Sequence, residues 1–449
     1  MFLKINLQPI IYHMKTKNIL KSLVLFLLCI AKTSAQEVLT LEDAIKIALE
    51  NNFEIKIAKN NLKINETNVA IGNAGMLPSA TASVVDDNSI KNSSQTRQDG
   101  TTTSLDNAKN NSLNYGVSLN WTIFDGMRMF AKYDQLKELQ NMGDAQLKWT
   151  IINKVSSVNS VYYDLIQEQQ KLSDLDSTIV ISQKRLEFTK NRYTIGKNSK
   201  LDVLNAQVDL NTDLGNLVKE KQAYSNAKTL LNQILARDLK TDFVVSDKIN
   251  VDRKLQLDAL MALAEKQNPE LEMQIINKKV AELELKQIKG DRYPTIKLNT
   301  GYNFSDSHSS LGFTSESSAH GLNYGFSASL NLFDGDAQNR NEKIAKMQID
   351  NSKLAIDQQL IQLRSNLIVA YQVYLTNLDL IDLEVNNTAI SKQNLEITGE
   401  KFKIGTITSV EFRAAQLNYI NSRIRLSDAQ FQAKLSEITL RELAGNLNF

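Results

Sequence analysis

A short motif that occurs twice limits what this chain can fold into more than any other feature of its sequence. The first copy, NYGVSLNWTIFDG, covers residues 114–126, and the second, NYGFSASLNLFDG, covers residues 323–335. In both copies large apolar side chains alternate with small or polar ones. Successive side chains leave a β-strand on opposite faces, so the alternation predicts strands with one apolar, aromatic face and one polar face. This pattern suits a barrel with lipid outside and water inside, and it also occurs in half-buried strands of soluble sandwiches.

The motif is part of a larger unit that the sequence contains twice. We expect residues 36–240 to form the first repeat, residues 241–254 a connector and residues 255–449 the second repeat. Each repeat is predicted to run in the order helix, strand, polar loop, strand, very long helix and shorter helix. The duplication therefore predicts four strands per chain, two from each repeat.

Two stretches without proline predict the very long helices. Residues 127–195 and residues 336–404 each contain a single glycine and carry apolar residues at three- and four-residue intervals. Unbroken, a helix of this length reaches roughly 100 Å, and such helices belong in coiled coils or helical tubes rather than in compact domains. After the first long helix, a shorter return helix is expected over residues 201–236.

The remaining segments predict shorter elements. Residues 39–75 show helical spacing, with Thr40 as the capping residue at the start. Residues 86–112 and 305–322 are so rich in polar residues that long solvated loops are expected there. The connector contains DFVVSD, which predicts one short strand.

The start of the chain has the features of a secretory signal peptide, which we take to cover residues 1–35. Lysines precede a short apolar run and small residues follow it, with either Met1 or Met14 as the first residue. The run is too short to span a bilayer. Its cysteine, Cys29, follows Leu28 where a lipoprotein signal has a small residue, so no acylation is predicted.

Composition after removal of this peptide argues against several classes of function. Residues 1–35 contain five lysines and no acids, so their loss changes the formal net charge from +2 to about −3, and nucleic-acid binding loses its electrostatic basis. The mature chain then has no cysteine, which excludes disulfides and thiolate metal sites. No run of about 20 apolar residues occurs, so no membrane-spanning helix is predicted.

Enzyme signatures are missing, and we predict no catalytic residue, no cofactor and no metal site. The sequence has no Gly-rich phosphate loop ending in Lys-Ser/Thr, no HExxH and no GxSxG. His308 and His320 lie near acids in a polar segment, where solvated histidines are the expectation.

The predicted strands require more than one chain. Four strands cannot close a barrel, and open edges beside an apolar face would aggregate. Two chains would give eight strands and three would give twelve, and a water-filled interior favours twelve. Tyr115, Trp121 and Tyr324 are expected as aromatic anchors at the membrane interfaces, and the alternative is an ordinary packed strand face.

Further paired motifs mark the ends of the strands and of the long helices. Both strand motifs end in FDG, and RYTIG at 192–196 matches KFKIG at 401–405 at the ends of the long helices. The predicted strand-end turns contain Asp125, Gly126, Asp334 and Gly335. With these paired motifs and its two repeats, the mature sequence resembles TolC-type outer-membrane efflux proteins over essentially its whole length.

This resemblance implies a mainly α-helical fold with β-structure. A homotrimer would form a twelve-stranded transmembrane β-barrel in the outer membrane, continued by a long periplasmic α-helical barrel of coiled coils. The implied partners are a periplasmic adaptor (membrane fusion) protein, an inner-membrane pump of the RND or ABC type, and outer-membrane lipid. The implied function is passive export of drugs, metals or proteins. The alternative is a structural periplasmic coiled-coil protein outside any membrane, and the long helices argue against a general diffusion porin.

The ends of the long helices are the candidate adaptor contacts that the resemblance implies. Gly196 and Gly405 are expected in the left-handed conformation that ends helices, and residues 199–202 and 408–411 fit capping boxes that start the return helices. Helix stop and start signals alone are the simpler explanation. The tip residues expected to contact an adaptor are Arg192, Tyr193, Gly196, Lys401, Phe402 and Gly405.

Asp202 and Glu411 occupy equivalent positions beside these tips. Three chains would supply six carboxylates at a gate, where they would attract cations. As acids in a first helical turn they would also simply stabilise the helix. In the resembled family a tyrosine and a basic residue hold the entrance shut, whereas Phe402 and Ile407 stand here, so closure is expected from packing of Phe402 and Tyr193.

Overall fold

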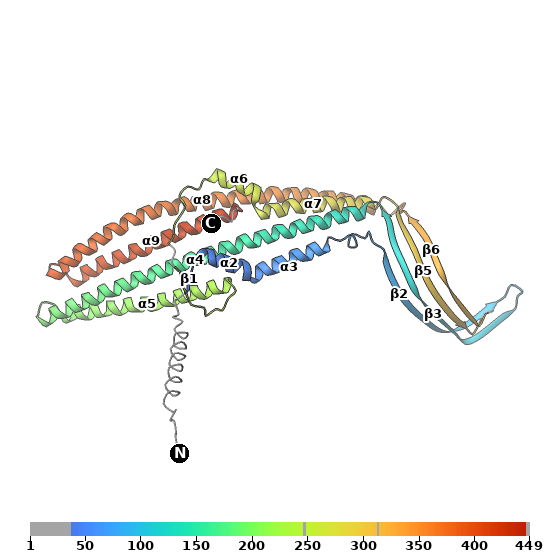
Figure 1. The fold of residues 1–449 in the computed structure, drawn as a ribbon, viewed down its shortest axis with the longest axis horizontal. Coiled ribbons are helices and arrows are strands. Elements are labelled where there is room, and N and C mark those ends of the chain that lie inside the picture. The colour runs from blue at the N-terminus through green and yellow to red at the C-terminus, as the bar shows by residue number, and fades with distance from the viewer. Residues whose placement is uncertain (1–36, 246–247, 312–313, 446–449) are drawn as a thin grey trace, which may run out of the picture. The chain divides into compact units, whose positions relative to one another are not determined.

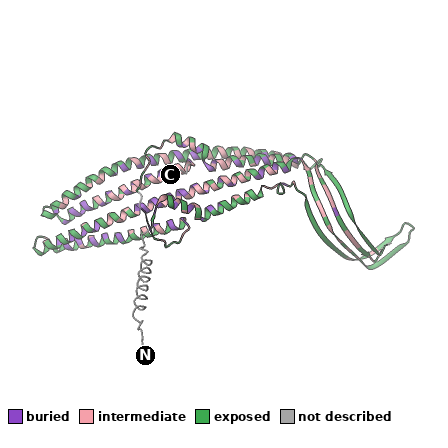
Figure 2. Cartoon of the chain, viewed as in Figure 1, coloured by how far each residue is buried: buried purple, intermediate pink, exposed green. Residues whose placement is uncertain are grey.

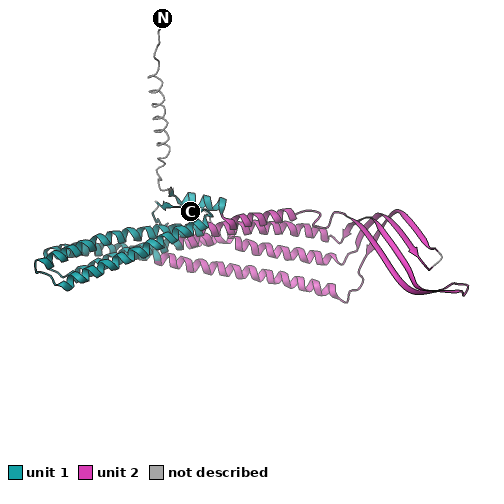
Figure 3. Ribbon diagram, turned by 90° about the horizontal axis from the view of Figure 1, so that it is seen from below, with its two compact units in different colours: residues 1–51, 157–251, 377–435 teal, residues 52–156, 252–376, 436–449 magenta. Residues whose placement is uncertain are grey.

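The computed structural model describes residues 37–245, 248–311 and 314–445. The predicted signal peptide lies outside these residues. The described chain divides into two compact units (Figure 3). One unit, called the tip unit below, comprises residues 37–51, 157–251 and 377–435, and the other, called the sheet unit, comprises residues 52–156, 252–376 and 436–445, with the gaps given above.

The sheet unit contains a four-stranded antiparallel sheet in the order β2-β3-β5-β6 (Figure 1). Its strands are β2 (Ser79–Thr96), β3 (Thr102–Asp125), β5 (Thr295–Ser309) and β6 (Glu316–Ser329). Each repeat supplies one hairpin, and the hairpins join through β3 and β5. The edge strands β2 and β6 have no further partner strand within the described chain.

The prediction of two long polar loops between the strands is wrong. β2 continues through the polar segment to Thr96 and pairs with β3 from Thr102 onward, which leaves only a tight turn between them. In the second repeat β5 continues to Ser309 and β6 begins at Glu316. The ladder consists of backbone hydrogen bonds, which need no apolar side chain, and hydroxyls also pair across it, as with Ser94 Oγ and Ser104 Oγ at 3.0 Å.

The predicted very long helices are confirmed. Helix α4 (Arg128–Thr194) has 67 residues and α8 (Ala337–Ile404) has 68. Each is followed by a 35-residue return helix, α5 (Lys200–Ile234) and α9 (Ser409–Leu443). No helix in the described ranges is both long and apolar enough to cross a membrane.

The single helix predicted over residues 39–75 is wrong, because it is broken at Asn52 and ends earlier. The chain forms α2 (Leu41–Asn51) and α3 (Phe53–Asn68), and the second repeat likewise forms α6 (Leu257–Gln267) and α7 (Pro269–Gly290). Asn52 Oδ1 accepts a hydrogen bond from the backbone N–H of Glu54 at 2.9 Å, and Asn268 Oδ1 accepts one from Leu271 at 3.1 Å. An asparagine side chain that caps a new helix in this way ends the preceding one.

The short strand predicted in the connector is confirmed as β4 (Phe243–Val245). It pairs in parallel with β1 (Glu37–Leu39), an element that the sequence did not predict. Leu39 is buried, and its carbonyl oxygen accepts a hydrogen bond from Tyr162 Oη of α4 at 2.9 Å.

The core of the tip unit lies between paired helices. One cluster joins α4 to α5 through Ile179, Leu186, Val203, Ala206, Leu210 and Leu217. Another joins α8 to α9 through Leu395, Phe402, Phe412 and Ala415. Figure 2 shows buried residues at intervals along these helices, as expected when one stripe of each helix packs on its partner.

Candidate functional site: the helical tips and the amphipathic sheet

Both helical hairpins turn through a left-handed glycine. Gly196 has φ 75° and Gly405 has φ 90°, a region that other residues rarely adopt. Beyond them, the N–H of Lys197 donates to the carbonyl of Arg192 at 2.8 Å, and the N–H of Thr406 donates to the carbonyl of Lys401 at 3.0 Å. These bonds satisfy carbonyls at the helix ends, so the two paired motifs form the same backbone turn.

Asp202 and Glu411 each take part in a capping box at the start of a return helix. The N–H of Ser199 donates to Asp202 Oδ2 at 3.0 Å, and the N–H of Thr408 donates to Glu411 Oε2 at 2.8 Å. The hydrogen bond from the Thr408 backbone, followed by that from its hydroxyl, lowers the pKa of Glu411 below its ordinary value. The Glu411 carboxylate therefore stays charged at neutral pH.

The two tips enclose a hollow of about 730 Å³ that both acids line. The structure thus brings Asp202 and Glu411 to one site within a single chain. Basic side chains line the same hollow, namely Arg192, Lys197 and Lys403. In a single chain the site is therefore mixed in charge rather than purely acidic.

Arg192 joins the first tip to the second. Its Nη2 atom donates to the carbonyl oxygens of Phe402 at 2.5 Å and Lys403 at 3.0 Å, and its guanidinium lies 5.1 Å from the centre of the Phe402 ring. A Cβ atom at Gly405 would lie 3.1 Å from Arg192 Nη2, so the glycine also leaves room for this contact. The sequence could not show the link, because its acceptors are backbone carbonyls at the end of α8.

The sequence predicts closure of the entrance by packing of Phe402 on Tyr193, but the structure does not bring these two residues together. Phe402 is only 2% exposed and stacks on Phe412 at 5.1 Å, within the hairpin of α8 and α9. Tyr193 is 44% exposed, and Lys200 Nζ lies 5.6 Å from the centre of its ring. Lys401, the residue that corresponds to Arg192, is also exposed.

A buried polar cluster that the sequence reasoning missed ties α5 to α9 and α4. Arg413 donates two hydrogen bonds to the Asp213 carboxylate, at 2.8 and 2.7 Å, and Ser182 Oγ donates to the same carboxylate at 2.5 Å. Gln416 Nε2 donates to Ser182 Oγ at 2.7 Å. All four side chains are nearly inaccessible to solvent, so this cluster fixes how the helices pack.

In the sheet unit, the strand-end turns start the long helices. Asp125 Oδ2 accepts a hydrogen bond from the N–H of Met129 at 3.1 Å, and Asp334 Oδ2 accepts one from the N–H of Gln338 at 2.8 Å. The following glycines, Gly126 and Gly335, have φ of 72° and 66°. In both FDG motifs the aspartate caps the long helix, but only the first directly ends a strand, because β6 already ends at Ser329 and the strand predicted through Leu332 is shorter in the structure.

The sheet has one apolar face and one polar face. The register aligns Tyr115 with Phe304 and Phe304 with His320, and the rings of Tyr115 and Phe304 stack at 4.8 Å. Trp121 and Tyr324 lie on the same face, and Tyr324 is 82% exposed. Residues on this face include Ala82, Val84, Val117, Leu119, Leu298, Tyr302, Leu322 and Phe326.

Comparison with known proteins assigns the family. The family model described as outer membrane efflux protein matches residues 44–237 and 260–446, which fall in the two repeats. The chain belongs to this family. The predicted resemblance is thereby confirmed, and with it the placement of the protein in the outer membrane.

Individual members of the outer membrane efflux family are similar at low identity. TolC of Vibrio cholerae is 23% identical over 322 residues, which cover 70% of this chain and 73% of that protein. The proteases secretion protein PrtF of Dickeya chrysanthemi is 20% identical over 440 residues, which cover 97% of this chain and 93% of that protein. The outer-membrane channel OprN superposes with a TM-score of 0.75 at 15% identity over 90% of each chain. The Campylobacter jejuni CmeC channel does so with 0.74 at 15% identity over 90% of this chain and 85% of that one.

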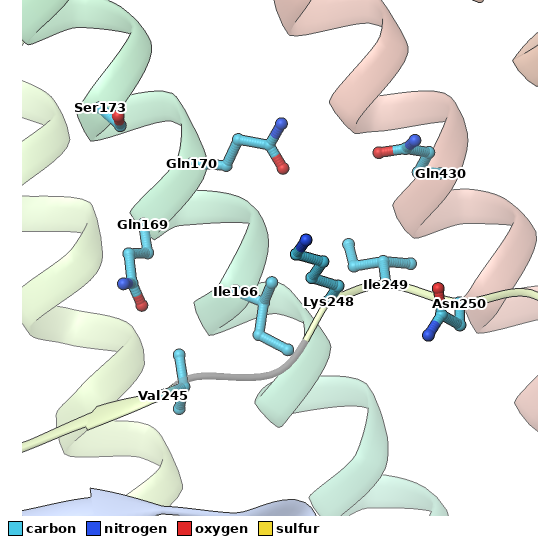
Figure 4. A pocket seen from close by; sticks show the side chains of 9 residues that line it. All are labelled: Ile166, Gln169, Gln170, Ser173, Val245, Lys248, Ile249, Asn250 and Gln430. Carbon is cyan, nitrogen blue, oxygen red and sulfur yellow. The ribbon is translucent and has the colours of Figure 1, made fainter.

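One further hollow of this efflux-family chain lies in the tip unit, beside α4, α9 and the segment after β4 (Figure 4). Its volume is about 640 Å³. Glutamines and aliphatic side chains line it together with a single charged group, Lys248. These nine lining residues contain no acid–base pair. In the described part of the chain, no group of three or more His, Cys, Asp or Glu residues is placed to hold a metal ion.

Proposed function

We propose that three copies of this chain assemble into the outer-membrane exit duct of a tripartite efflux or secretion system. The observation that carries the proposal is the four-stranded sheet, which exposes an apolar, aromatic face and two unpaired edges in a member of the outer membrane efflux family. Substrates would pass through the duct passively, since the sequence contains no enzyme signature and no Gly-rich phosphate loop ending in Lys-Ser/Thr.

The dimensions of the apolar face fit a membrane. On β5 the apolar face runs from Ile296 to Phe304, a length close to the roughly 9–11 residues that a tilted transmembrane strand needs. Beyond Phe304 the strand becomes polar with Asp306. Pairing β2 of one copy with β6 of the next would remove both edges, and three copies would give about twelve strands around a water-filled interior.

A regular apolar stripe on α8 supports assembly of several copies. Apolar residues recur at seven-residue spacing, the repeat of a coiled coil, and all of them are exposed in the single chain. The stripe consists of Met347, Leu354, Ile361, Ile368 and Leu375 and, after one extra residue, Leu383, Ile390, Ile397 and Ile404. Leu201, Leu204 and Val208 form a shorter exposed stripe on α5. Helices of neighbouring copies are the partners that such stripes fit.

The tips are the proposed docking site for a periplasmic adaptor, which would link the duct to an inner-membrane pump of the RND or ABC type. Tyr193, Ile195 and Ile404 expose large side chains at the turns. The tip residues proposed to contact the adaptor remain Arg192, Tyr193, Gly196, Lys401, Phe402 and Gly405. Since Phe402 is buried, its part would be to hold the second tip in shape rather than to touch the partner.

A gate at the same tips would use the Arg192 link and the acids. Arg192 holds the two tips of one chain together through backbone carbonyls, and adaptor binding would favour a state in which this link is broken. Asp202 and Glu411 would give the entrance its negative charge once three copies meet.

The proposal is tested by purifying the mature chain from outer membranes and measuring its mass in detergent. A trimer that needs detergent to stay in solution is expected. Because Cys29 is the only cysteine and lies in the predicted signal peptide, Thr81→Cys on β2 combined with Ser327→Cys on β6 provides clean labels at the two edges. A bifunctional thiol reagent should then link three chains. A monomer that remains soluble without detergent would overturn the proposal and favour a structural periplasmic protein.

A further inference from the structure

The polar face of the sheet is almost free of charge. Opposite the apolar band, its side chains come from alternate positions of β2 (79–85), β3 (114–122), β5 (295–305) and β6 (319–329). They are serine, threonine, asparagine, glycine, alanine and valine, with one exception. Of the described residues at these positions, only Lys297 carries a charge.

Lys297 lies near the start of β5, at the end of the strand that follows α7. The register places it between Thr122 of β3 and Ser327 of β6, both small and neutral. The residue is exposed, and no carboxylate of the described chain lies within ion-pair distance of its Nζ atom. Its charge is therefore not neutralised by a partner in the same chain.

We propose that Lys297 sets the charge selectivity of the β-barrel, favouring anionic solutes and opposing cationic ones. This inference rests on the proposed trimeric duct, in which the polar face lines the water-filled interior. Three copies would place three ammonium groups at one level of the barrel, at the strand ends next to the helices. The side chains in register with Lys297, Thr122 and Ser327, are neutral. The acid that this face carries at the end of β3, Asp125, pairs with Thr295 and accepts a hydrogen bond from the N–H of Met129 at the start of α4.

The size of the effect follows from charge screening. Unit charges roughly 10 Å apart interact weakly in water, and salt at 0.1 M screens them over about the same distance, so three lysines should change the anion-to-cation permeability ratio by about two- to fivefold. At 1 M salt the Debye length falls to about 3 Å and the effect should nearly vanish.

The test is a reversal potential, measured for the full mature chain in a planar bilayer under a gradient of potassium chloride near 0.1 M. Lys297→Gln should lower the anion-to-cation permeability ratio by about two- to fivefold, and Lys297→Glu should lower it further. Lys109 provides the matched control, because it lies on the opposite face of the sheet, in register with Ile90. Lys109→Glu makes the same change of charge and should leave the ratio unchanged. An unchanged ratio in Lys297→Glu, or an equal shift in Lys109→Glu, would overturn the inference.

Thiol labelling separates a failure of this inference from a failure of the duct. In the cysteine-free mature chain, a charged, membrane-impermeant maleimide should label Lys297→Cys and should not label the adjacent Leu298→Cys on the apolar face. The opposite labelling, or a protein that forms no channel, would refute the proposed duct itself. Correct labelling with unaltered selectivity would refute only the role of Lys297.

Discussion

The long helices α4 and α8 occupy equivalent positions in the two repeats, but their surfaces differ. In α8 the residues Ile361 and Leu375 belong to the exposed apolar stripe, whereas the equivalent residues of α4, Ile152 and Ile166, are buried. The duplication therefore preserved the backbone while the two helices took different environments. At these positions α4 packs within the single chain, whereas α8 leaves its apolar side chains exposed.

The tips differ in the same way. Their glycines share one backbone conformation, yet Phe402 is buried and the equivalent Tyr193 is exposed. Arg192 reaches across to the other tip, whereas the equivalent Lys401 offers only its backbone carbonyl to hydrogen bonds within its own turn. The two turns thus share one backbone conformation, but their equivalent side chains have different roles.

Further along the hairpins, the repeats differ in buried charge. Ser182 hydrogen-bonds Asp213 between α4 and α5, and at the equivalent positions Ser391 hydrogen-bonds Ser422 between α8 and α9, at 2.7 Å. Only the first repeat places a carboxylate there, and Arg413 neutralises it. This difference can be tested by exchanging the residues.

The largest expected effect comes from Asp213→Ser, which gives the first repeat the residue that the second repeat has at the equivalent position, Ser422. It leaves the buried Arg413 with only the partly exposed Asp209, whose Oδ1 lies 3.9 Å from its Nε, so the free energy of unfolding should fall by about 3 kcal/mol. Ser422→Ala, the matched change in the second repeat, removes a neutral hydrogen bond and should cost about 1 kcal/mol. Denaturant unfolding followed by circular dichroism in detergent measures both. Equal losses would show that the two hairpins do not differ in this respect.

A smaller effect is expected from Arg192→Gln at the tips. The change weakens two hydrogen bonds from a charged donor that is partly exposed, so the link between the tips should lose about 1–2 kcal/mol. In a bilayer, the reconstituted chain should then spend more time in conducting states. Lys401→Gln removes the equivalent charge from the other tip and should not change the conductance. If both variants conduct alike, Arg192 is not part of the gate.

The first repeat also contains a titratable cluster. The carboxyl group of Glu168 on α4 lies beside that of Glu220 on α5, and Lys171 Nζ lies 3.3 Å from both Glu168 Oε1 and Asp428 Oδ1 of α9. At the positions equivalent to Glu220 and Lys171, the second repeat has Ala429 and Leu380. Burial, followed by the hydrogen bond and charge of Glu168, raises the pKa of Glu220 to about 7.

Stability should therefore fall as the pH rises from 4.5 to about 7. Over this range Glu220 keeps its proton in the folded state but has lost it in the unfolded state. The stabilisation is therefore complete below the ordinary pKa of 4.5 and is lost as the pH rises through the raised pKa of about 7. Glu220→Gln should flatten the dependence of the unfolding midpoint on pH over this window. Glu396→Gln, at an exposed position of α8, should leave it unchanged. A slope that persists in Glu220→Gln would assign the titration to another group such as Asp164 or Glu442, since burial raises the pKa of each.

Periodicity in the sequence predicted the long helices and the amphipathic strands, because each of these depends on a local pattern of side chains, whereas the family was predicted from the resemblance that the two repeats and their paired motifs carry. Periodicity failed where backbone hydrogen bonds alone decide the structure. The polar continuation of β2 and the acceptors of Arg192 leave no side-chain signal. The break at Asn52 did leave one, since Asn268 stands at the equivalent position, but helical spacing on both sides concealed it.

The smallest expected difference lies between the two tip acids, which the repeats retain in nearly the same form. Asp202→Asn combined with Glu411→Gln should leave both return helices folded, since Ser199 and Thr408 still cap them through their hydroxyl oxygens. If three copies bring these acids to a common entrance, their loss should lower the cation-to-anion permeability ratio by a few-fold, measured as a reversal potential at low salt. Because hydrogen bonds lower the pKa of Glu411, this contribution should persist down to about its ordinary pKa of 4.5 and disappear only at lower pH. Unchanged selectivity would leave the acids with helix capping alone, and the neighbouring Arg192, Lys197 and Lys403 would then explain why their charge has no effect at the entrance.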